Sequence, residues 1–321
     1  MTNQPDTISI RPSNWSDFLG QPQVVRSLQI AIQAAKSRQE PMEHTLLYGP
    51  PGLGKTTLAH IIANEMGVNL KITSGPALTR AGDLASILTA LEPGDVLFID
   101  EIHRLNKPVE EALYPAMEDY AIDIILGKGP AAKNLRLDLN PFTLIGATTQ
   151  AGKISSPLRD RFGIVHRLRF YEPEELKGII LKAAKKLKLK LDDDSALEIA
   201  KRSRGTARIA LKLLRRVRDF NLVEHDSKSN LDITQESLEF YEVDNEGLDA
   251  TDRRLLEAII IQHAGGPVGL ETLAAIISES VDTISDLYEP YLMQSGFLSK
   301  TSRGRVATDK AYQHLGKTKP L

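Results

Sequence analysis

One motif constrains the fold and the chemistry of this chain more than any other: Gly49-Pro50-Pro51-Gly52-Leu53-Gly54-Lys55-Thr56, which matches the phosphate-binding pattern G-x-x-x-x-G-K-T. An apolar strand is predicted to lead into it, and a helix with apolar residues at helical spacing is predicted to follow it and end at Gly67. Glycines let backbone N–H groups turn toward phosphate oxygens, and the positive end of the following helix strengthens that field. The motif therefore predicts a nucleoside triphosphate site.

Each part of the loop has an expected role. Lys55 can reach the β- and γ-phosphates, and the Thr56 hydroxyl can bind Mg²⁺. The other expected nucleotide-binding residues of this segment are Gly49, Gly52, Gly54 and Thr57. A Gly- and Pro-rich turn that matches by chance is the alternative, and the flanking strand and helix disfavour it.

Two carboxylates, Asp100 and Glu101, follow the continuous apolar run of residues 96–99. Such a run is typical of a strand buried on both faces of a parallel sheet, and ligands bind at the carboxyl ends of these strands. Asp100 is expected to hold the magnesium shell, and Glu101 to orient or deprotonate the attacking water. Because binding alone does not require the second carboxylate, the pair favours hydrolysis. Thr148 ends the next apolar strand and could position the water or sense the γ-phosphate.

Composition bounds the class of protein. At 321 residues the chain is expected to form two or three domains, and 41% hydrophobic residues suffice for their cores. No apolar run approaches a membrane span, and no secretory pattern appears at the N-terminus. Cysteine is absent, so we expect neither disulfides nor thiolate metal sites, and a cytoplasmic location. The net charge of −2 conceals basic segments, for which solvated helix faces are the alternative explanation.

Alternating strands and helices over residues 1–171 predict a doubly wound α/β domain. Residues 122–126 and 134–139 interrupt this order as two strand-like arms around a turn-rich centre, which predicts a β-hairpin. Exposed apolar residues on such an arm indicate a partner surface, although a hairpin lying back on its own domain is an equal alternative. Residues 172–243 show an almost purely helical pattern and predict a small helical domain.

The last segment, residues 244–321, has three predicted helices followed by two short strands, the order of a winged helix-turn-helix domain. Lys300, Arg303 and Arg305 surround Gly304 in the turn between those strands. A short basic hairpin can place its side chains against DNA phosphates or in a minor groove. A solvated basic turn is the alternative, and we favour DNA binding.

Two further arginines are candidates for catalysis. Arg161 lies in a short helical segment after Thr148, and an arginine there could stabilise the transferring phosphoryl group, also from a neighbouring subunit. Arg208 opens a helix of the small domain, where contact with the γ-phosphate would couple nucleotide state to domain angle. A surface salt bridge is the alternative for Arg161.

Taken together, these motifs resemble the RuvB family of AAA+ ATPases, the bacterial Holliday-junction branch-migration motors. The resemblance extends from residue 10 to about residue 316. Its carriers are Gly-Pro-Pro-Gly-Leu-Gly-Lys-Thr at 49–56, Asp-Glu-Ile-His at 100–103, Tyr-Pro-Ala-Met-Glu-Asp at 114–119, Gly-Lys-Gly-Pro at 127–130, Ile-Gly-Ala-Thr-Thr at 145–149, Ser-Pro-Leu-Arg-Asp-Arg-Phe-Gly at 156–163 and Gly-Gly-Pro-Val-Gly-Leu at 265–270. The first two occur across many AAA+ proteins, whereas the others in this order are specific.

The resemblance implies a P-loop AAA+ domain, a helical lid and a winged-helix DNA-binding domain that hydrolyse ATP with Mg²⁺. It implies a homo-hexameric ring around duplex DNA at four-way junctions, acting in recombination, repair and the SOS response. It implies RuvA as a partner, bound by the hairpin 122–139, and RuvC in a larger complex, with no membrane contact. Arg161 would be the arginine finger given to the neighbouring subunit, Thr148 the first sensor and Arg208 the second. Residues near the nucleotide would be Ile10, Arg11, Glu118, Asp119, Tyr120 and Tyr171.

Three positions depart from the family pattern, namely Ala207, Lys300 and Ser302, where proline, arginine and proline are usual. They could loosen the start of the Arg208 helix and soften the wing, without changing the functional interpretation. An initiator- or loader-type AAA+ switch that binds DNA but moves nothing is the alternative function. An AAA+ chaperone is a third, which the terminal winged unit disfavours.

Overall fold

The computed structural model describes residues 10–126 and 133–319. The chain folds into two compact units. The first runs up to Gly49 and from Leu53 to Arg169, and the second comprises Pro50–Gly52 and the chain from Phe170 onward. No helix among the described residues has both the length and the apolar character needed to cross a bilayer.

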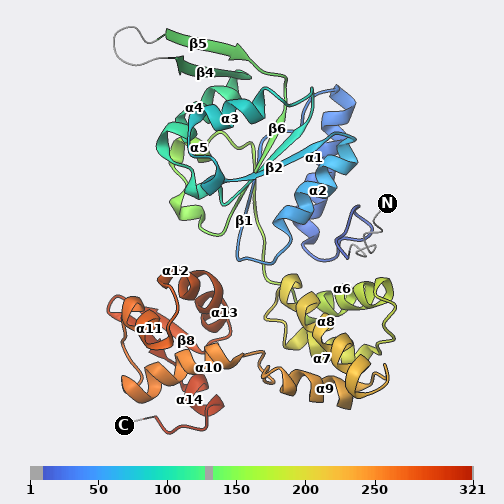
Figure 1. Cartoon of the computed structure of the whole chain (residues 1–321), viewed down its shortest axis with the longest axis vertical. Coiled ribbons are helices and arrows are strands. Elements are labelled where there is room, and N and C mark those ends of the chain that lie inside the picture. The colour runs from blue at the N-terminus through green and yellow to red at the C-terminus, as the bar shows by residue number, and fades with distance from the viewer. Residues whose placement is uncertain (1–9, 127–132, 320–321) are drawn as a thin grey trace. The chain divides into compact units, whose positions relative to one another are not determined.

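The first unit is built on a five-stranded parallel sheet in the order β2-β3-β6-β1-β7 (Figure 1). The strands are β1 Thr45–Tyr48, β2 Leu70–Ser74, β3 Val96–Asp100, β6 Thr143–Thr148 and β7 Ile164–Arg167. The predicted α/β core is therefore confirmed. Strand β7, at the edge beside β1, was not predicted, because only two of its four residues are apolar.

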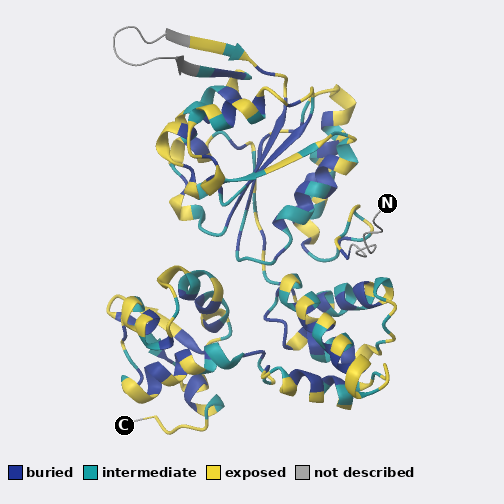
Figure 2. Cartoon of the chain, in the orientation of Figure 1, coloured by how far each residue is buried: buried dark blue, intermediate teal, exposed yellow. Residues whose placement is uncertain are grey.

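Helices cover both faces of this sheet. Figure 1 shows α1 and α2 on one face and α3, α4 and α5 on the other. Their bounds are α1 Pro22–Arg38, α2 Lys55–Met66, α3 Ala81–Leu88, α4 Lys107–Glu118 and α5 Ser156–Arg159. Strands β3 and β6 are buried almost throughout, as Figure 2 shows, so their carboxyl ends are held in a rigid core.

Helix ends follow signals that the sequence carries. Helix α2 begins at Lys55, directly after Gly54, and ends before Gly67, whose φ of 74° permits its N–H to reach the carbonyls of Ala63 and Asn64. Asn106 caps α4 by accepting a hydrogen bond from the N–H of Val109.

The predicted hairpin is present as two antiparallel strands, β4 Ala121–Leu126 and β5 Lys133–Asp138. It projects from the body of the first unit (Figure 1). Its base is anchored by buried Ile122 and Leu139, while Leu135 on β5 is 43% exposed. The connecting residues 127–132 lie outside the described residues.

The second unit contains the predicted helices of the small domain: α6 Pro173–Lys186, α7 Asp193–Lys201, α8 Ala207–Glu224 and α9 Leu231–Phe240. We refer to residues 171–244 as the lid. Pro173 occupies the first turn of α6, and Thr206 caps α8 by accepting a hydrogen bond from the N–H of Ile209.

The C-terminal part has its own core and a two-stranded wing. Its elements are α10 Ala250–Glu257, the π-helical turn Ala258–Gln262, α11 Leu270–Ile277, α12 Val281–Thr283, the π-helical turn Ile284–Tyr288, α13 Glu289–Gln294, β8 Leu298–Thr301, β9 Gly304–Ala307 and α14 Asp309–His314. The winged-helix prediction is confirmed, but α14 was missed and two predicted single helices contain π-helical turns.

Candidate nucleotide and DNA sites

The phosphate loop and the ends of β3 and β6 lie at one edge of the sheet. Tyr48 and Thr148 are partners in the pairing of β1 with β6, and the N–H of Gly49 donates to the carbonyl of Thr148 at 3.2 Å. Ile99, the residue before Asp100, pairs with Gly146 on the same side. The structure therefore brings the loop, Asp100 and Thr148 to a common carboxyl edge, as the sequence predicts.

The loop needs its glycines. Gly49, Gly52 and Gly54 have φ values of 141°, 83° and 99°, which side-chain-bearing residues rarely adopt. A Cβ atom on Gly49 would lie 2.6 Å from the Leu168 carbonyl oxygen. Among the described residues no side chain caps the N-terminus of α2. A tight loop that opens into an uncapped helix N-terminus suits an anion such as a triphosphate.

Lys55 is held over this loop. Its side chain is nearly buried, with 8% of the residue exposed, and Nζ donates to the carbonyl of Gly49 at 2.7 Å. The bond curls the ammonium back across the loop rather than letting it extend into solvent. A desolvated positive charge at that position attracts phosphate oxygens strongly, because burial weakens dielectric screening.

Asp100 and Glu101 differ in backbone conformation. Asp100 ends β3, and its Oδ1 accepts the N–H of Glu101 at 2.9 Å. Glu101 has a left-handed φ of 48°, and its Oε2 lies 3.2 Å from Nη1 of Arg104. The two adjacent carboxylates therefore have different partners within the chain, a backbone N–H for Asp100 and a guanidinium for Glu101. Thr56 and Asp100 are both half-buried oxygen donors, the type that Mg²⁺ prefers.

Thr148 proves to be engaged within the chain. Only 1% of the residue is exposed; its Oγ1 accepts the N–H of Gln150 at 2.9 Å and shares a 2.9 Å hydrogen bond with Nδ1 of His103. The next residue, Thr149, is half-exposed. Sequence reasoning gave Thr149 no role, although it belongs to the same Thr-Thr pair at the strand end and is the more accessible of the two.

Arg161 lies at the opposite, amino edge of the sheet. It precedes β7, whose first residue Ile164 pairs with Thr45, the first residue of β1. Its Nη1 donates to the Pro157 carbonyl at 2.6 Å, and its Nη2 lies 3.2 Å from the carboxylate of Glu118. These contacts hold the guanidinium against α4 and α5.

Glu118, Asp119 and Tyr120 lie at the same amino edge. The carbonyl of Met117 lies 3.0 Å from Nε2 of His44, the residue before β1, and the Tyr120 ring packs on His44. Strand β1 separates this edge from Gly49 by about 13 Å, since Gly49 is four residues beyond Thr45 and each residue adds about 3.3 Å. The segment 118–120 is therefore placed away from the phosphate loop of its own chain.

Ile10 and Arg11 lie near helix α2. Asn64 on α2 donates to the carbonyl of Ser13, and Ile10 is 9% exposed. Burial, and then the nearby charge of Arg11, lowers the pKa of His60 on α2. Ile10 and Arg11, which we expect to line the nucleotide, thus lie beside the helix that follows the phosphate loop.

The second unit contains Tyr171 and Arg208. The N–H of Tyr171 donates to the carbonyl of Gly205 at 2.8 Å, and the N–H of Arg208 lies 3.3 Å from the carbonyl of Gly52. The middle of the phosphate loop, Pro50–Gly52, belongs to this unit. Arg208 itself is exposed.

In the wing, the three basic residues separate into two environments. Lys300 and Arg303 are exposed. Arg305 is 13% exposed in its side chain, and its Nε lies 2.5 Å from Oε1 of Glu289, a residue only 5% exposed. The sequence suggested three equivalent cations, but Arg305 is committed to a carboxylate of α13.

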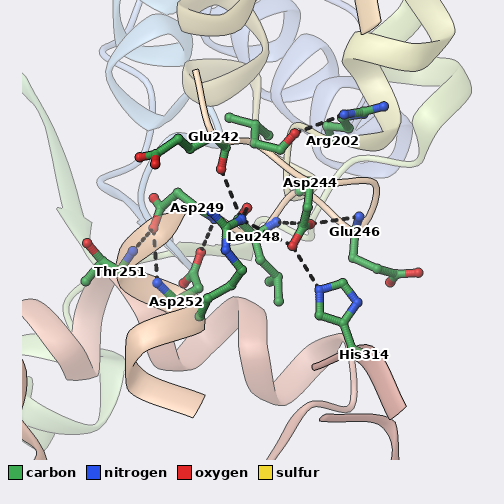
Figure 3. Close-up of polar contacts among 12 residues, drawn as sticks. Arg202, Glu242, Asp244, Glu246, Leu248, Asp249, Thr251, Asp252 and His314 are labelled. Atoms are coloured by element: carbon green, nitrogen blue, oxygen red, sulfur yellow. Dashed lines mark hydrogen bonds and ion pairs between the residues drawn. The ribbon is translucent and has the colours of Figure 1, made fainter. Parts of the chain in front are cut away.

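The segment after the lid is held by a dense polar network (Figure 3). Asp244 accepts hydrogen bonds from the N–H groups of Glu246 and Leu248, and its Oδ2 lies 2.8 Å from Nε2 of His314. Asp249 accepts from the N–H groups of Thr251 and Asp252 and so caps α10.

Arg204 connects the same network to the turn before α8. Its Nη2 lies 2.7 Å from Asp249 and 2.5 Å from Asp252, and its Nε donates to the carbonyl of Gly247. Burial raises the pKa of Asp252 to about 7, although the Arg204 charge opposes that rise. No sequence motif had singled out this arginine.

Comparison with known proteins identifies the family. Three family models match successive parts of the chain: the Holliday junction DNA helicase RuvB P-loop domain at residues 10–168, the RuvB AAA lid domain at 171–244, and the RuvB C-terminal winged helix domain at 245–316. The chain belongs to the RuvB family.

Solved structures agree with this assignment. The Thermotoga maritima RuvB Holliday junction branch migration motor is 52% identical, with a TM-score of 0.89 over 97% of this chain and 99% of that one. A single-substitution variant of that RuvB is 53% identical, with a TM-score of 0.90 over the same shares. The RuvB family consists of branch-migration motors with an AAA+ ATPase domain, so the initiator- or loader-type alternative is not favoured.

Proposed function

We propose that this chain is an ATP-driven DNA translocase that promotes branch migration of four-way junctions together with RuvA. Membership of the RuvB family supports the ATPase and the junction substrate. The arrangement of the chain's own residues supports a mechanism in which ATP is hydrolysed between subunits.

The carboxyl edge of the sheet supplies half of this site. Gly49, Gly52 and Gly54 shape the loop around the triphosphate, and Lys55 neutralises its β- and γ-phosphates. Thr57 continues the first turn of α2 and adds its N–H to the cradle. Glu101 orients the attacking water and accepts its proton. Thr56 and Asp100 would hold Mg²⁺, which neutralises developing phosphate charge when bound.

Arg161 carries the argument for a shared site. It is paired with Glu118 at the amino edge of β1, whereas the phosphate loop leaves the carboxyl edge. One β1 strand therefore lies between the arginine and the loop of the same chain. An arginine finger in this position serves a neighbouring subunit, in a heterologous contact that can close into a ring. Glu118, Asp119 and Tyr120 would accompany it to the neighbour's nucleotide.

The remaining expectations form part of the proposal. Lys300 and Arg303 would contact DNA phosphates through the exposed wing, and the projecting hairpin 122–139 would bind RuvA. Ile10, Arg11, Tyr171 and Arg208 would complete the nucleotide site. A six-membered ring, association with RuvC, a role in the SOS response and a cytoplasmic location stay predictions, as do the domain limits at residues 171/172 and 243/244.

A synthetic four-way junction tests the proposal. With RuvA, ATP and Mg²⁺ at low salt, the chain should separate the junction into two duplexes. Glu101→Gln should keep ATP binding and lose both hydrolysis and separation. Separation at the same rate with Glu101→Gln, or none with the unsubstituted chain, would contradict an ATP-driven motor.

Mixing experiments test the shared site. Lys55→Ala subunits lack a working phosphate loop but keep Arg161, and Arg161→Ala subunits have the reverse defect. Hydrolysis should reappear when the two are mixed, because some sites combine an intact loop with an intact arginine. Absence of hydrolysis at every mixing ratio would contradict a site shared between subunits.

A further inference from the structure

Arg161 rests on the face of an aromatic ring. Its guanidinium carbon lies 4.2 Å from the centroid of the Tyr114 ring, on helix α4. A guanidinium over the face of a tyrosine is attracted by the ring quadrupole. The arginine side chain is 22% exposed, so this contact is largely shielded from water.

The ring is fixed by a second set of contacts. Tyr114 Oη donates to Oε1 of Glu110, one turn earlier on α4, at 2.5 Å. The same carboxylate oxygen accepts a hydrogen bond from the Ser155 hydroxyl. Ser155 caps α5, because its Oγ accepts the N–H of Leu158 at 3.3 Å. Glu110 therefore joins the tyrosine to the start of the helix that leads to Arg161.

The contacts of Arg161 are of unequal strength. Glu118 is 56% exposed in its side chain, so its ion pair is screened by water and easily exchanged. The Tyr114 ring and the Pro157 carbonyl are neutral groups, which do not compete with a phosphate for the charge. Nε of Arg161 is buried and has no hydrogen-bond partner among the described residues. A triphosphate can thus replace Glu118 while the ring keeps the guanidinium plane in place.

We propose that Tyr114 is a positioning residue for Arg161, and that Glu110 transmits its effect by fixing the ring and the start of α5 together. The inference rests on the proposed function, since it assigns the device that aims the arginine finger toward the neighbouring subunit. Tyr114 touches no substrate in this scheme and acts through Arg161 alone. Preorganisation of this kind removes the need to order a flexible side chain at the moment of reaction.

Steady-state ATP hydrolysis by the full chain, with duplex DNA, tests this role. Tyr114→Leu removes the ring face, and kcat should fall about 10- to 100-fold while KM changes less than about 2-fold. Tyr114→Phe keeps the ring and loses only the hydroxyl, so it should retain more activity than Tyr114→Leu. A loss in Tyr114→Phe equal to that in Tyr114→Leu would contradict a role for the ring face.

A matched control comes from the lid. The guanidinium of Arg216 lies 4.9 Å from the centroid of the Tyr241 ring, which is the same type of contact at another place. Tyr241→Leu should leave kcat unchanged. An equal loss in Tyr241→Leu and Tyr114→Leu would show that removal of any such contact damages the protein, and would overturn the proposal.

The decisive experiment mixes Tyr114→Leu subunits with Lys55→Ala subunits, beside a mixture of Arg161→Ala with Lys55→Ala. If Tyr114 only positions Arg161, a Tyr114→Leu subunit keeps a working phosphate loop, and an arginine from a Lys55→Ala neighbour restores hydrolysis. Recovery in both mixtures supports the proposal. Recovery only in the Arg161→Ala mixture overturns it, because Tyr114 would then act on its own subunit's site or fold. Recovery in neither overturns the shared site itself, and the proposal with it.

Discussion

The carboxylate of Glu118 and the guanidinium of Arg161 lie 3.2 Å apart at the amino edge of β1, and the phosphate loop begins at the other end of that strand. Position within the sheet, rather than spacing in the sequence, thus separates the two halves of the proposed ATP site. Each subunit would offer a loop on one edge and an arginine on the other.

Arg161→Lys should behave like Arg161→Ala rather than like the unsubstituted chain. An ammonium cannot stack flat on Tyr114 and contact Pro157 and a phosphate in the fork geometry of a guanidinium. We expect kcat for ATP hydrolysis to fall at least about 100-fold. Arg159→Lys is the control, because Arg159 is exposed and donates to the carbonyl of Ala151. Full activity in Arg161→Lys would mean that a positive charge at this position is enough for ATP hydrolysis, without the geometry of the guanidinium.

The two threonines at the end of β6 should give different phenotypes. Thr148→Val removes the acceptor of the Gln150 N–H inside the protein, which should destabilise the fold by about 1–3 kcal/mol. Thr149→Val changes a half-exposed residue, so it should leave the melting temperature unchanged and lower kcat. Thermal melting and ATP hydrolysis on both variants distinguish them. The opposite result, in which Thr148→Val keeps its stability but has a lower kcat while Thr149→Val is normal in both, would mean that Thr148 and not Thr149 acts in hydrolysis.

Substitutions of Arg303 and Arg305 should have different effects, the first on DNA binding and the second on stability. Arg303→Ala should weaken DNA binding and lower the slope of log affinity against log salt by about one, with normal stability. Arg305→Ala leaves the buried Glu289 without its partner and should destabilise the C-terminal domain by about 3–5 kcal/mol. Replacing both members by apolar residues of similar size, as Arg305→Met with Glu289→Met, should recover much of that stability. Normal melting of Arg305→Ala would show that the ion pair does not support the wing.

Asp252 should make stability depend on pH. Its pKa of about 7 in the folded chain lies above the ordinary value of 3.8, so the folded state binds the proton more tightly. The stabilisation is complete below pH 3.8 and is lost as pH rises through 7, at about 1.4 kcal/mol per pH unit in between.

Asp252→Asn should therefore flatten the decrease in unfolding free energy between pH 5 and 7, measured by urea unfolding of the full chain. Asp309→Asn is the matched control, since Asp309 is exposed and pairs with Lys319 at the surface. Equal slopes in Asp252→Asn and the unsubstituted chain would place the pKa of Asp252 near its ordinary value.

Local signals account for what could be predicted. Pro22 and Gly67 mark where α1 begins and where α2 ends, and the apolar run 96–99 marks a buried strand. The phosphate loop, Asp100 and Glu101 could be placed at one edge of the sheet because each lies at the end of a strand, while the catalytic roles of the two carboxylates stay predictions. Strand β7 escaped because an edge strand buries only part of its side chains and shows no continuous apolar run.

The features that could not be predicted from the sequence depend on contacts between residues that are far apart in the chain. Nothing near Arg305 indicates Glu289, sixteen residues earlier, as its partner. Arg204 reaches Asp252 across 48 positions, and only the fold brings them together. The hydroxyl of buried Thr148 likewise shares a hydrogen bond with His103, 45 positions earlier in the 3-10 turn that follows β3. The type of a residue indicates what chemistry its side chain could perform. The fold determines whether that side chain is exposed to a ligand or already engaged by another residue of the chain.

At Glu101, the left-handed backbone conformation favours glycine, whereas the proposed role in hydrolysis requires a carboxylate. A glycine would adopt a φ of 48° without the cost of about 1–2 kcal/mol that a side chain incurs there. A search that selects for heat resistance alone would consequently favour Glu101→Gly, which relieves the backbone but removes the carboxylate that we propose to activate water. A side chain at this position therefore costs stability, and the role in hydrolysis proposed above would account for a glutamate there.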